Sequence, residues 1–224
     1  MPAMVAHVRS AALTLLAGLT LAAASATAQT PPPDDDAVAP EAPAPDAPRS
    51  VAVGVPWHGR LEHGVQLPAA GTDFVTWDPI LQRSPNREWR RWGTGALVVL
   101  LDTVTREFRA AHPGVPPILI ADLSRPQGGP FGRRYGGLGH GSHQNGLDAD
   151  VMYPRRDGLL RATIRPSQVD RALAQDLVDG FLRAGAVKLF VGPDLHLGGP
   201  RDVVVALAHH DDHVHVRIAT PPGE

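Results

Sequence analysis

The sequence predicts a small α+β domain in which helices pack on a mainly antiparallel sheet. Two kinds of periodicity lead to this fold class. Segments 94–111 and 169–182 carry apolar residues at helical spacing, whereas segments 148–152 and 213–218 alternate apolar and polar residues. The chain has no internal repeat, so we expect one domain rather than a repeat array.

The first expected helix spans Thr94–Ala111, and Pro113 and Gly114 then end it. Its apolar stripe consists of Leu97, Leu100, Leu101, Val104 and Phe108. A short buried strand is expected next, over Ile118–Ala121.

A glycine-rich segment, Gly128–Gly141, has seven glycines in fourteen positions and is expected to form a loop. The strand predicted after it, Asp148–Met152, places Ala149 and Val151 on one face. Asp148 and Asp150 then share the opposite, polar face.

The second helix is predicted from its apolar residues, with Ser167 as its N-cap and Gly185 just past its end. That apolar stripe is Val169, Leu173, Leu177, Phe181 and Leu182. Two more strands are expected, over Val187–Val191 and His213–Ile218.

The N-terminal part divides into two segments that precede the expected domain of residues 51–224. Residues 1–28 have the pattern of a secretory signal peptide: an apolar run over 11–24, then Ala26-Thr27-Ala28. The run is too short to span a bilayer, so we expect cleavage and no membrane anchor, with an uncleaved helix as the alternative. Residues 29–50 are rich in proline and acidic residues and are expected to form a disordered linker.

Composition excludes several classes of function. The formal net charge is −2, which gives no support for nucleic-acid binding. The chain has no cysteine, which rules out disulfides, thiolate zinc sites and cysteine nucleophiles. Any metal must therefore be held by nitrogen and oxygen ligands.

Six of the eleven histidines fall in two short segments. In the first, the glycine-rich loop carries His140 and His143 to the start of the strand that contains Asp150. A loop histidine and a strand carboxylate can meet on one metal in this arrangement. In the second, His213 and His215 are two apart in a strand and point to the same side, with His210 just before them.

Neutral imidazoles and a carboxylate, with one position left for water, are typical of catalytic zinc. Zinc lowers the pKa of its bound water and polarises a substrate carbonyl. A histidine in a strand is more often a simple surface or core residue, but two such segments in one cysteine-free domain favour a zinc site at the sheet face.

Two long motifs resemble the penicillin-insensitive murein endopeptidases, which are zinc peptidases of the lysostaphin, D-Ala-D-Ala peptidase and hedgehog superfamily. The motifs are Gly139-His140-x-Ser142-His143-Gln144-x-Gly146-Leu147-Asp148-x-Asp150 and His210-x-x-His213-x-His215-Val216-Arg217. Similar segments occur upstream at 64–68, 92–93 and 122–129. The resemblance covers nearly all of residues 51–220.

The resemblance implies a role for each matched residue. The implied zinc ligands are His143, Asp150 and His215, and His140 is a further candidate ligand. His213 would orient the water or stabilise the oxyanion, and His210 would act as a base or contact the substrate. No Asp/His pair between Asp150 and the last strand matches a second metal site, so one or two zinc ions stay open.

The implied activity is hydrolysis of D-alanyl–meso-diaminopimelate cross-links between peptidoglycan stem peptides, in the periplasm. One alternative is a D-Ala-D-Ala-type carboxypeptidase, but segment 211–215 lacks the glutamate that this branch places before its last histidine. The other alternative is a non-catalytic module that binds the cell wall, against which the complete histidine and aspartate set argues. The sequence indicates no oligomeric state.

Other polar residues near these motifs have two interpretations each. Asp148 would either orient a ligand histidine or be a plain carboxylate at the loop edge. Asp211 and Asp212 have the same two interpretations, and we favour solvated side chains for both. Arg217 would meet either a substrate carboxylate or a surface acid. The arginines at 83, 87, 90 and 91 are expected to form a solvated face, with contact to an anionic wall polymer as the alternative. The four tryptophans are expected in the core, with the lining of a glycan groove as the alternative.

Overall fold

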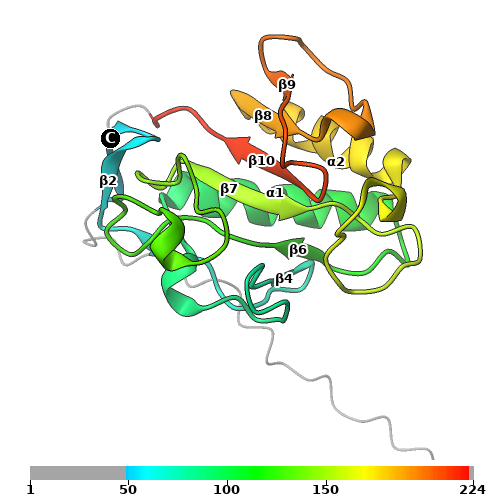
Figure 1. Ribbon diagram of the computed structural model, residues 1–224, viewed down its shortest axis with the longest axis horizontal. Coiled ribbons are helices and arrows are strands. Elements are labelled where there is room, and N and C mark those ends of the chain that lie inside the picture. Colours follow the sequence, from blue (N-terminus) through cyan, green and yellow to red (C-terminus); the bar gives the residue numbers. More distant parts are fainter. Residues whose placement is uncertain (1–48, 222–224) are drawn as a thin grey trace, which may run out of the picture. The chain divides into compact units, whose positions relative to one another are not determined.

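The computed structural model describes residues 49–221, and the predicted signal peptide and most of the predicted linker lie outside this range. The described chain folds into two α-helices and three sheets (Figure 1). Ser50, the last residue of the predicted linker, is buried, and its Oγ accepts a hydrogen bond from the Gly95 amide. No helix within residues 49–221 is long and apolar enough to cross a membrane.

The main sheet has six strands in the order β4-β6-β7-β10-β8-β9. The three central pairings, β6–β7, β7–β10 and β10–β8, are antiparallel, whereas β4–β6 and β8–β9 are parallel. The strands are β4 (Phe74–Thr76), β6 (Ile118–Ile120), β7 (Asp148–Met152), β8 (Lys188–Val191), β9 (Val204–Ala206) and β10 (His213–Arg217). The expected mixture of helices and mainly antiparallel sheets is therefore confirmed.

Two smaller antiparallel sheets were not predicted. They pair β1 (Val51–Val55) with β2 (His58–Glu62), and β3 (Val65–Gln66) with β5 (Trp92–Gly93). β3 and β5 have only two residues each, and β1 and β2, although five residues long, each bury a single residue, so none of these strands shows a clear apolar alternation. Short 3₁₀ turns complete the fold: η1 (Glu88–Arg90), η2 (Arg133–Tyr135), η3 (Pro166–Gln168) and η4 (Pro193–Leu195).

The helices α1 (Gly95–Ala111) and α2 (Arg171–Arg183) cover one face of the main sheet. Figure 1 shows α1 running behind β7 and β6. Their buried apolar stripes pack against alternate residues of the central strands, among them Ala149, Val151, Val214 and Val216. Because side chains alternate along a strand, the neighbouring polar residues of β7 and β10 must point to the other face.

Helix α1 matches the prediction, with Thr94 as its N-cap, whereas the predicted start of α2 is wrong. Ser167 lies in η3, and Val169 after it has extended backbone angles. The helix begins only at Arg171, because the Asp170 side chain accepts hydrogen bonds from the Ala172 and Leu173 amides. Gly185 does follow the helix end, with φ of 89°.

Candidate metal centre

The centre of the site is one cross-strand pair on the face of the sheet opposite the helices. In the register of β7 and β10, Asp150 pairs with His215, and Asp148 pairs with Arg217. Directly paired residues of neighbouring strands have side chains in contact. The alternation that buries the valines against the helices therefore brings Asp150 and His215 together.

His143 reaches this pair from the loop that precedes β7. It is 1% exposed and has a φ of 64°, an uncommon angle for a residue with a side chain. Its Nδ1 lies 2.8 Å from the Leu123 carbonyl oxygen. A carbonyl can only accept, so Nδ1 carries the proton and the Nε2 lone pair faces the site.

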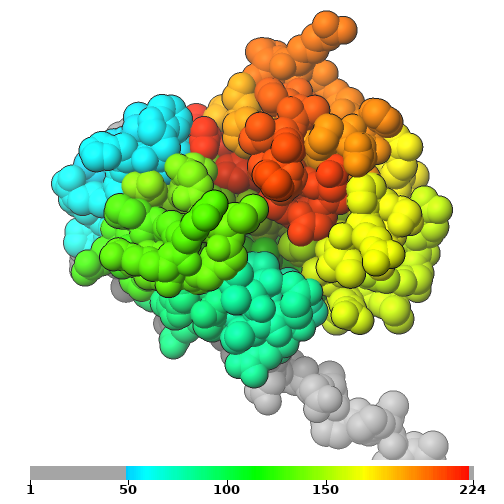
Figure 2. All heavy atoms as spheres, in the orientation of Figure 1, coloured from blue at the N-terminus to red at the C-terminus, as the bar shows by residue number. Residues whose placement is uncertain are grey.

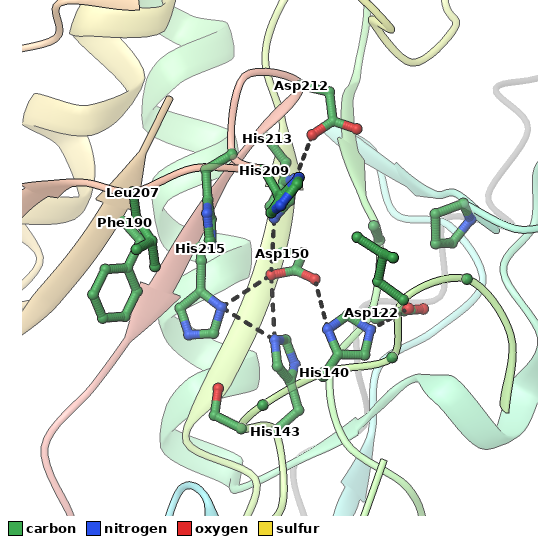
Figure 3. A pocket seen from close by; sticks show the side chains of 18 of the residues that line it. Asp122, His140, His143, Asp150, Phe190, Leu207, His209, Asp212, His213 and His215 are labelled. Carbon is green, nitrogen blue, oxygen red and sulfur yellow. Dashed lines mark hydrogen bonds and ion pairs between the residues drawn. The ribbon is translucent and has the colours of Figure 1, made fainter. Parts of the chain in front are cut away.

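Three donor atoms meet at the spacing that a tetrahedral metal ion requires (Figure 3). His143 Nε2 lies 3.2 Å from His215 Nδ1 and 3.3 Å from Asp150 Oδ1, and His215 Nδ1 lies 3.2 Å from Asp150 Oδ1. Ligand bonds of about 2.0–2.1 Å in a tetrahedron place neighbouring ligand atoms roughly 3.3 Å apart.

Asp150 Oδ1 supports this interpretation, because it is buried and makes no hydrogen bond. The ring nitrogens His215 Nδ1, His143 Nε2 and His213 Nε2 surround it at 3.2, 3.3 and 3.6 Å. A buried polar atom left without a hydrogen bond in a ring of nitrogen donors fits a bound cation. The residues present therefore suit a divalent metal that accepts nitrogen and oxygen ligands, as zinc does.

His140 adds a fourth nitrogen at the edge of the cluster. Its Nδ1 lies 3.4 Å from Asp150 Oδ2, and His140, His143 and Asp150 offer ligand atoms that all lie within 4.8 Å of one another. Its Nε2 lies 2.8 Å from Asp122 Oδ2. The glycine before it is required, because Gly139 has a φ of 74° and a Cβ there would come within 2.5 Å of Gly132.

The two remaining predicted histidines line the same cleft. His213 Nδ1 lies 2.7 Å from Asp212 Oδ1, and its Nε2 faces Asp150. His210 Nδ1 lies 3.0 Å from the Ala208 carbonyl oxygen, and the His210 ring lies 4.9 Å from the His213 ring. The structure therefore brings all six predicted site residues into one cleft.

Charged neighbours set the protonation of these side chains. Burial acts to lower the pKa of His215, but Asp148 and Asp150 outweigh it and raise that pKa to about 9. Burial also opposes the charged form of His213, yet Asp150 and Asp212 raise its pKa. Burial lowers the pKa of His143 and, together with the nearby His213, lowers that of His210.

The structure shows the surroundings of the polar residues for which the sequence allowed two interpretations. Asp148 is fully buried; it accepts hydrogen bonds from the His143 amide and the Arg217 guanidinium, and its Oδ1 lies 3.2 Å from His215 Nε2. It is therefore a partner of the site histidines and not a loop-edge carboxylate. Arg217 lies on the site face and pairs with this buried acid, and Asp212 contacts His213 although its side chain is 45% exposed.

The cleft above the cluster has a volume of about 670 Å³. Figure 2 shows the hollow between the green glycine-rich loop and the orange-red segment that leads into β10. Its walls include apolar side chains that the sequence did not single out for the site: Ile80, Leu138, Phe190 and Leu207.

The expectations for the arginine cluster and for the four tryptophans are partly wrong. Arg90 and Arg91 are buried, so the arginine cluster is not one solvated face. Trp77 is in the core as expected, but Trp57 is 59% exposed and lines the cleft. Both errors arise because an isolated arginine or tryptophan carries no periodicity that would reveal its surroundings.

The fold and the site define a protein with a cluster of histidines and aspartate, able to hold a metal ion, on the open face of a mainly antiparallel sheet. The chain matches the family model described as penicillin-insensitive murein endopeptidase over residues 52–181, and it belongs to that family. This span includes His140, His143 and Asp150, whereas His210, His213 and His215 lie beyond its end. No curated protein matches the chain.

Proposed function

We propose that this protein is a secreted, zinc-dependent murein endopeptidase that hydrolyses D-alanyl–meso-diaminopimelate cross-links of peptidoglycan. Family membership supports a hydrolase that acts on murein. The single observation that carries the zinc proposal is the set of three donor atoms, 3.2–3.3 Å apart, around the buried Asp150 Oδ1.

His143 Nε2, Asp150 Oδ1 and His215 Nδ1 would hold the zinc ion, with His140 Nδ1 as a further candidate. When bound in such a site, zinc acts as a Lewis acid that makes water a stronger nucleophile and polarises a carbonyl. The Leu123 carbonyl and Asp148 keep the ligand rings of His143 and His215 in their orientations, as partners of ligand histidines commonly do.

His213 and His210 would divide the proton transfers between them. The Asp212 carboxylate beside Nδ1 stabilises the protonated His213 ring, whose Nε2–H can donate to an oxygen that gains negative charge. The neutral Ala208 carbonyl beside His210 Nδ1 leaves its Nε2 free to accept a proton from the attacking water. Two nearby groups with pKa values shifted in opposite directions are a common acid–base arrangement.

The apolar walls of the cleft suit the methyl groups of D-alanine. Ile80, Leu138 and Leu207 are exposed apolar side chains beside the polar cluster. An apolar cleft with a few converging polar groups is typical of a substrate site. The proposed periplasmic location follows from the predicted signal peptide and from the substrate of the family.

The test uses the purified protein and a cross-linked dimeric muropeptide, with and without a chelator, and mass spectrometry of the products. Conversion of the dimer into two intact monomers, abolished by the chelator and restored by zinc, is the expected result. Loss of one terminal D-alanine would instead indicate a carboxypeptidase. A dimer that stays unchanged with zinc present would contradict the proposal and favour a wall-binding module.

A further inference from the structure

A buried ion pair lies directly beneath the cleft, between Arg90 and Asp122. Arg90 is 1% exposed and Asp122 is 0% exposed. Arg90 Nε donates to Asp122 Oδ1 at 2.6 Å, and Arg90 Nη2 donates to Oδ2 at 2.5 Å. Burying two charges costs free energy of desolvation, so stability alone is a weak reason for such a pair.

The remaining hydrogen-bonding capacity of this ion pair is directed toward His140 and the loop that carries it. Asp122 Oδ2 lies 2.8 Å from His140 Nε2, and Arg90 Nη1 donates to the Tyr135 carbonyl oxygen in the same loop. The Asn86 amide donates to Asp122 Oδ1 from a third direction. The carboxylate is therefore held in one orientation by two side chains while it contacts the histidine.

The chemistry of Asp122 decides which nitrogen of His140 carries the proton. Both Asp122 oxygens accept hydrogen bonds from the Arg90 guanidinium, which leaves neither of them protonated, so the group is a carboxylate. A carboxylate only accepts hydrogen bonds, so His140 Nε2 must donate. In the neutral ring, the lone pair is then on Nδ1, 3.4 Å from Asp150 Oδ2.

Two acceptors that face each other at this distance repel each other unless a proton or a metal cation lies between them. Asp150 belongs to the proposed zinc ligands, so the Nδ1 lone pair of His140 points at the same cluster. Phe131 packs against the His140 ring at a tilt of 55°, and the two ring centroids lie 4.7 Å apart. The ring is thus confined by packing as well as by its hydrogen bond.

We propose that Asp122, held in place by Arg90 and Asn86, is a positioning residue that selects the Nε2–H tautomer of His140 and aims its Nδ1 at the cluster. The claim about the tautomer is independent of the proposed function. Its consequence, stronger metal binding, rests on the proposed zinc site.

The tautomer can be measured directly in the metal-free protein by long-range ¹H–¹⁵N NMR correlation of the histidine rings, at about pH 8. The His140 signals are assigned by their loss in His140→Gln. We expect the Nε2–H form for the neutral ring. A wild-type ring that carries its proton on Nδ1 overturns the proposal, and this result requires no variant that alters the ion pair.

Asp122→Asn provides the second arm, since an amide can either donate or accept and no longer dictates the tautomer. We expect loss of the tautomer preference and weaker zinc binding by about 10- to 100-fold. The matched control is Asp78→Asn, because Asp78 is another fully buried carboxylate paired with an arginine, Arg87, but does not contact His140.

The outcomes separate this proposal from the proposed function. Asp78→Asn should leave the His140 tautomer unchanged, and a folded Asp122→Asn protein that retains the wild-type tautomer contradicts the positioning role. If the wild-type tautomer is Nε2–H and Asp122→Asn removes it, the positioning role stands even for a protein that does not cleave the muropeptide. Failure of cleavage alone counts only against the proposed function.

Discussion

Four of the site histidines have one ring nitrogen hydrogen-bonded to a fixed partner, which leaves the other nitrogen for the cleft. The partner is the Leu123 carbonyl for His143 and the Asp212 carboxylate for His213. A carbonyl favours a neutral ring with its lone pair toward the site, whereas a carboxylate stabilises the charged ring. Chemically identical side chains thereby acquire different roles.

Replacement of a ligand should differ from replacement of a proton donor. In His143→Ala we expect loss of both bound zinc and hydrolysis, because one of three donor atoms is gone. In His213→Ala we expect zinc to remain and kcat to fall about 100- to 10,000-fold, the range for a lost acid–base group. Zinc per chain and muropeptide kinetics measure the two effects.

The exposed His58, which lies in β2, provides the control, and His58→Ala should change neither quantity. Retention of zinc and activity in His143→Ala would overturn the ligand assignment. Loss of zinc in His213→Ala would move that residue from acid–base chemistry to metal binding.

The Asp212 carboxylate should set the alkaline limit of activity. Asp150 and Asp212 raise the pKa of His213 against the effect of burial. If the protonated ring is the active form, activity falls as the pH rises through this pKa. Asp212→Asn lowers the pKa, so the alkaline limb of the kcat profile should shift to lower pH. An unchanged limb would assign it to another group.

At the scale of elements, the antiparallel pair β7–β10 assembles the site and the helices support it from behind. The register pairs Asp150 with His215, and a slip of either strand by one residue would turn its side chain toward the helices and away from the other residue of the pair. The loop before β7 then brings His140 and His143 over the strand pair. The site therefore depends on correct packing of α1 and α2 against the apolar face.

The beginning of α2 can be tested through its cap. Asp170 accepts hydrogen bonds from the first-turn amides of Ala172 and Leu173, whereas the Ser167 side chain caps no helix. We expect Asp170→Ala to lower the free energy of unfolding by about 1 kcal/mol. Ser167→Ala should change it by less than about 0.5 kcal/mol. Urea unfolding curves measure both, and equal effects would place the cap elsewhere.

At the scale of the described domain, one face of the main sheet packs against the helices, and the other carries the polar cluster beside a small apolar cluster that includes Leu119 and Met152. The helix side contributes the buried core, whereas the other side concentrates buried acids and histidines in one cleft. Such a polar cluster costs free energy of desolvation unless its charges are paired. A bound cation among Asp148, Asp150 and the histidines would complete the pairing and stabilise the fold.

Zinc should therefore raise the melting temperature, and more so at higher pH. His215 has a pKa of about 9 in the metal-free fold, above its ordinary value of 6.5. Its protonation stabilises the metal-free fold below about pH 6.5, and this contribution is lost as the pH rises through about 9. Since zinc requires the neutral ring, protons compete with it and binding strengthens with pH.

At one fixed zinc concentration, about 100 times the Kd at pH 8, the expected stabilisation at that pH is about 2.7 kcal/mol, or roughly 5–10 °C in Tm. Differential scanning calorimetry at about pH 6 and about pH 8 compares the shifts. A shift that is larger at the lower pH would contradict the assigned protonation of the metal-free site. His143→Ala, without a ligand, should show little shift at either pH.

Periodicity was sufficient to predict the parts of the fold that depend on local pattern. The 3.6-residue spacing of 94–111 and the alternation in 148–152 and 213–217 reflect burial of one face, which a sequence records directly. The loop and strand motifs likewise contain all six predicted site residues. These motifs do not indicate which ring nitrogen of each histidine faces the cluster.

Contacts between residues that are distant in the chain depend on long-range packing. Arg90 and Asp122 were not predicted as a pair beneath His140, because contact between η1, the end of β6 and the loop leaves no local spacing to detect. Burial of Asp148 and exposure of Trp57 were decided in the same way. Local sequence patterns specify the helices, the central strands and the chemical groups of the site. Long-range packing specifies the partners, protonation and geometry of those groups, because these depend on atoms that the chain brings together only on folding.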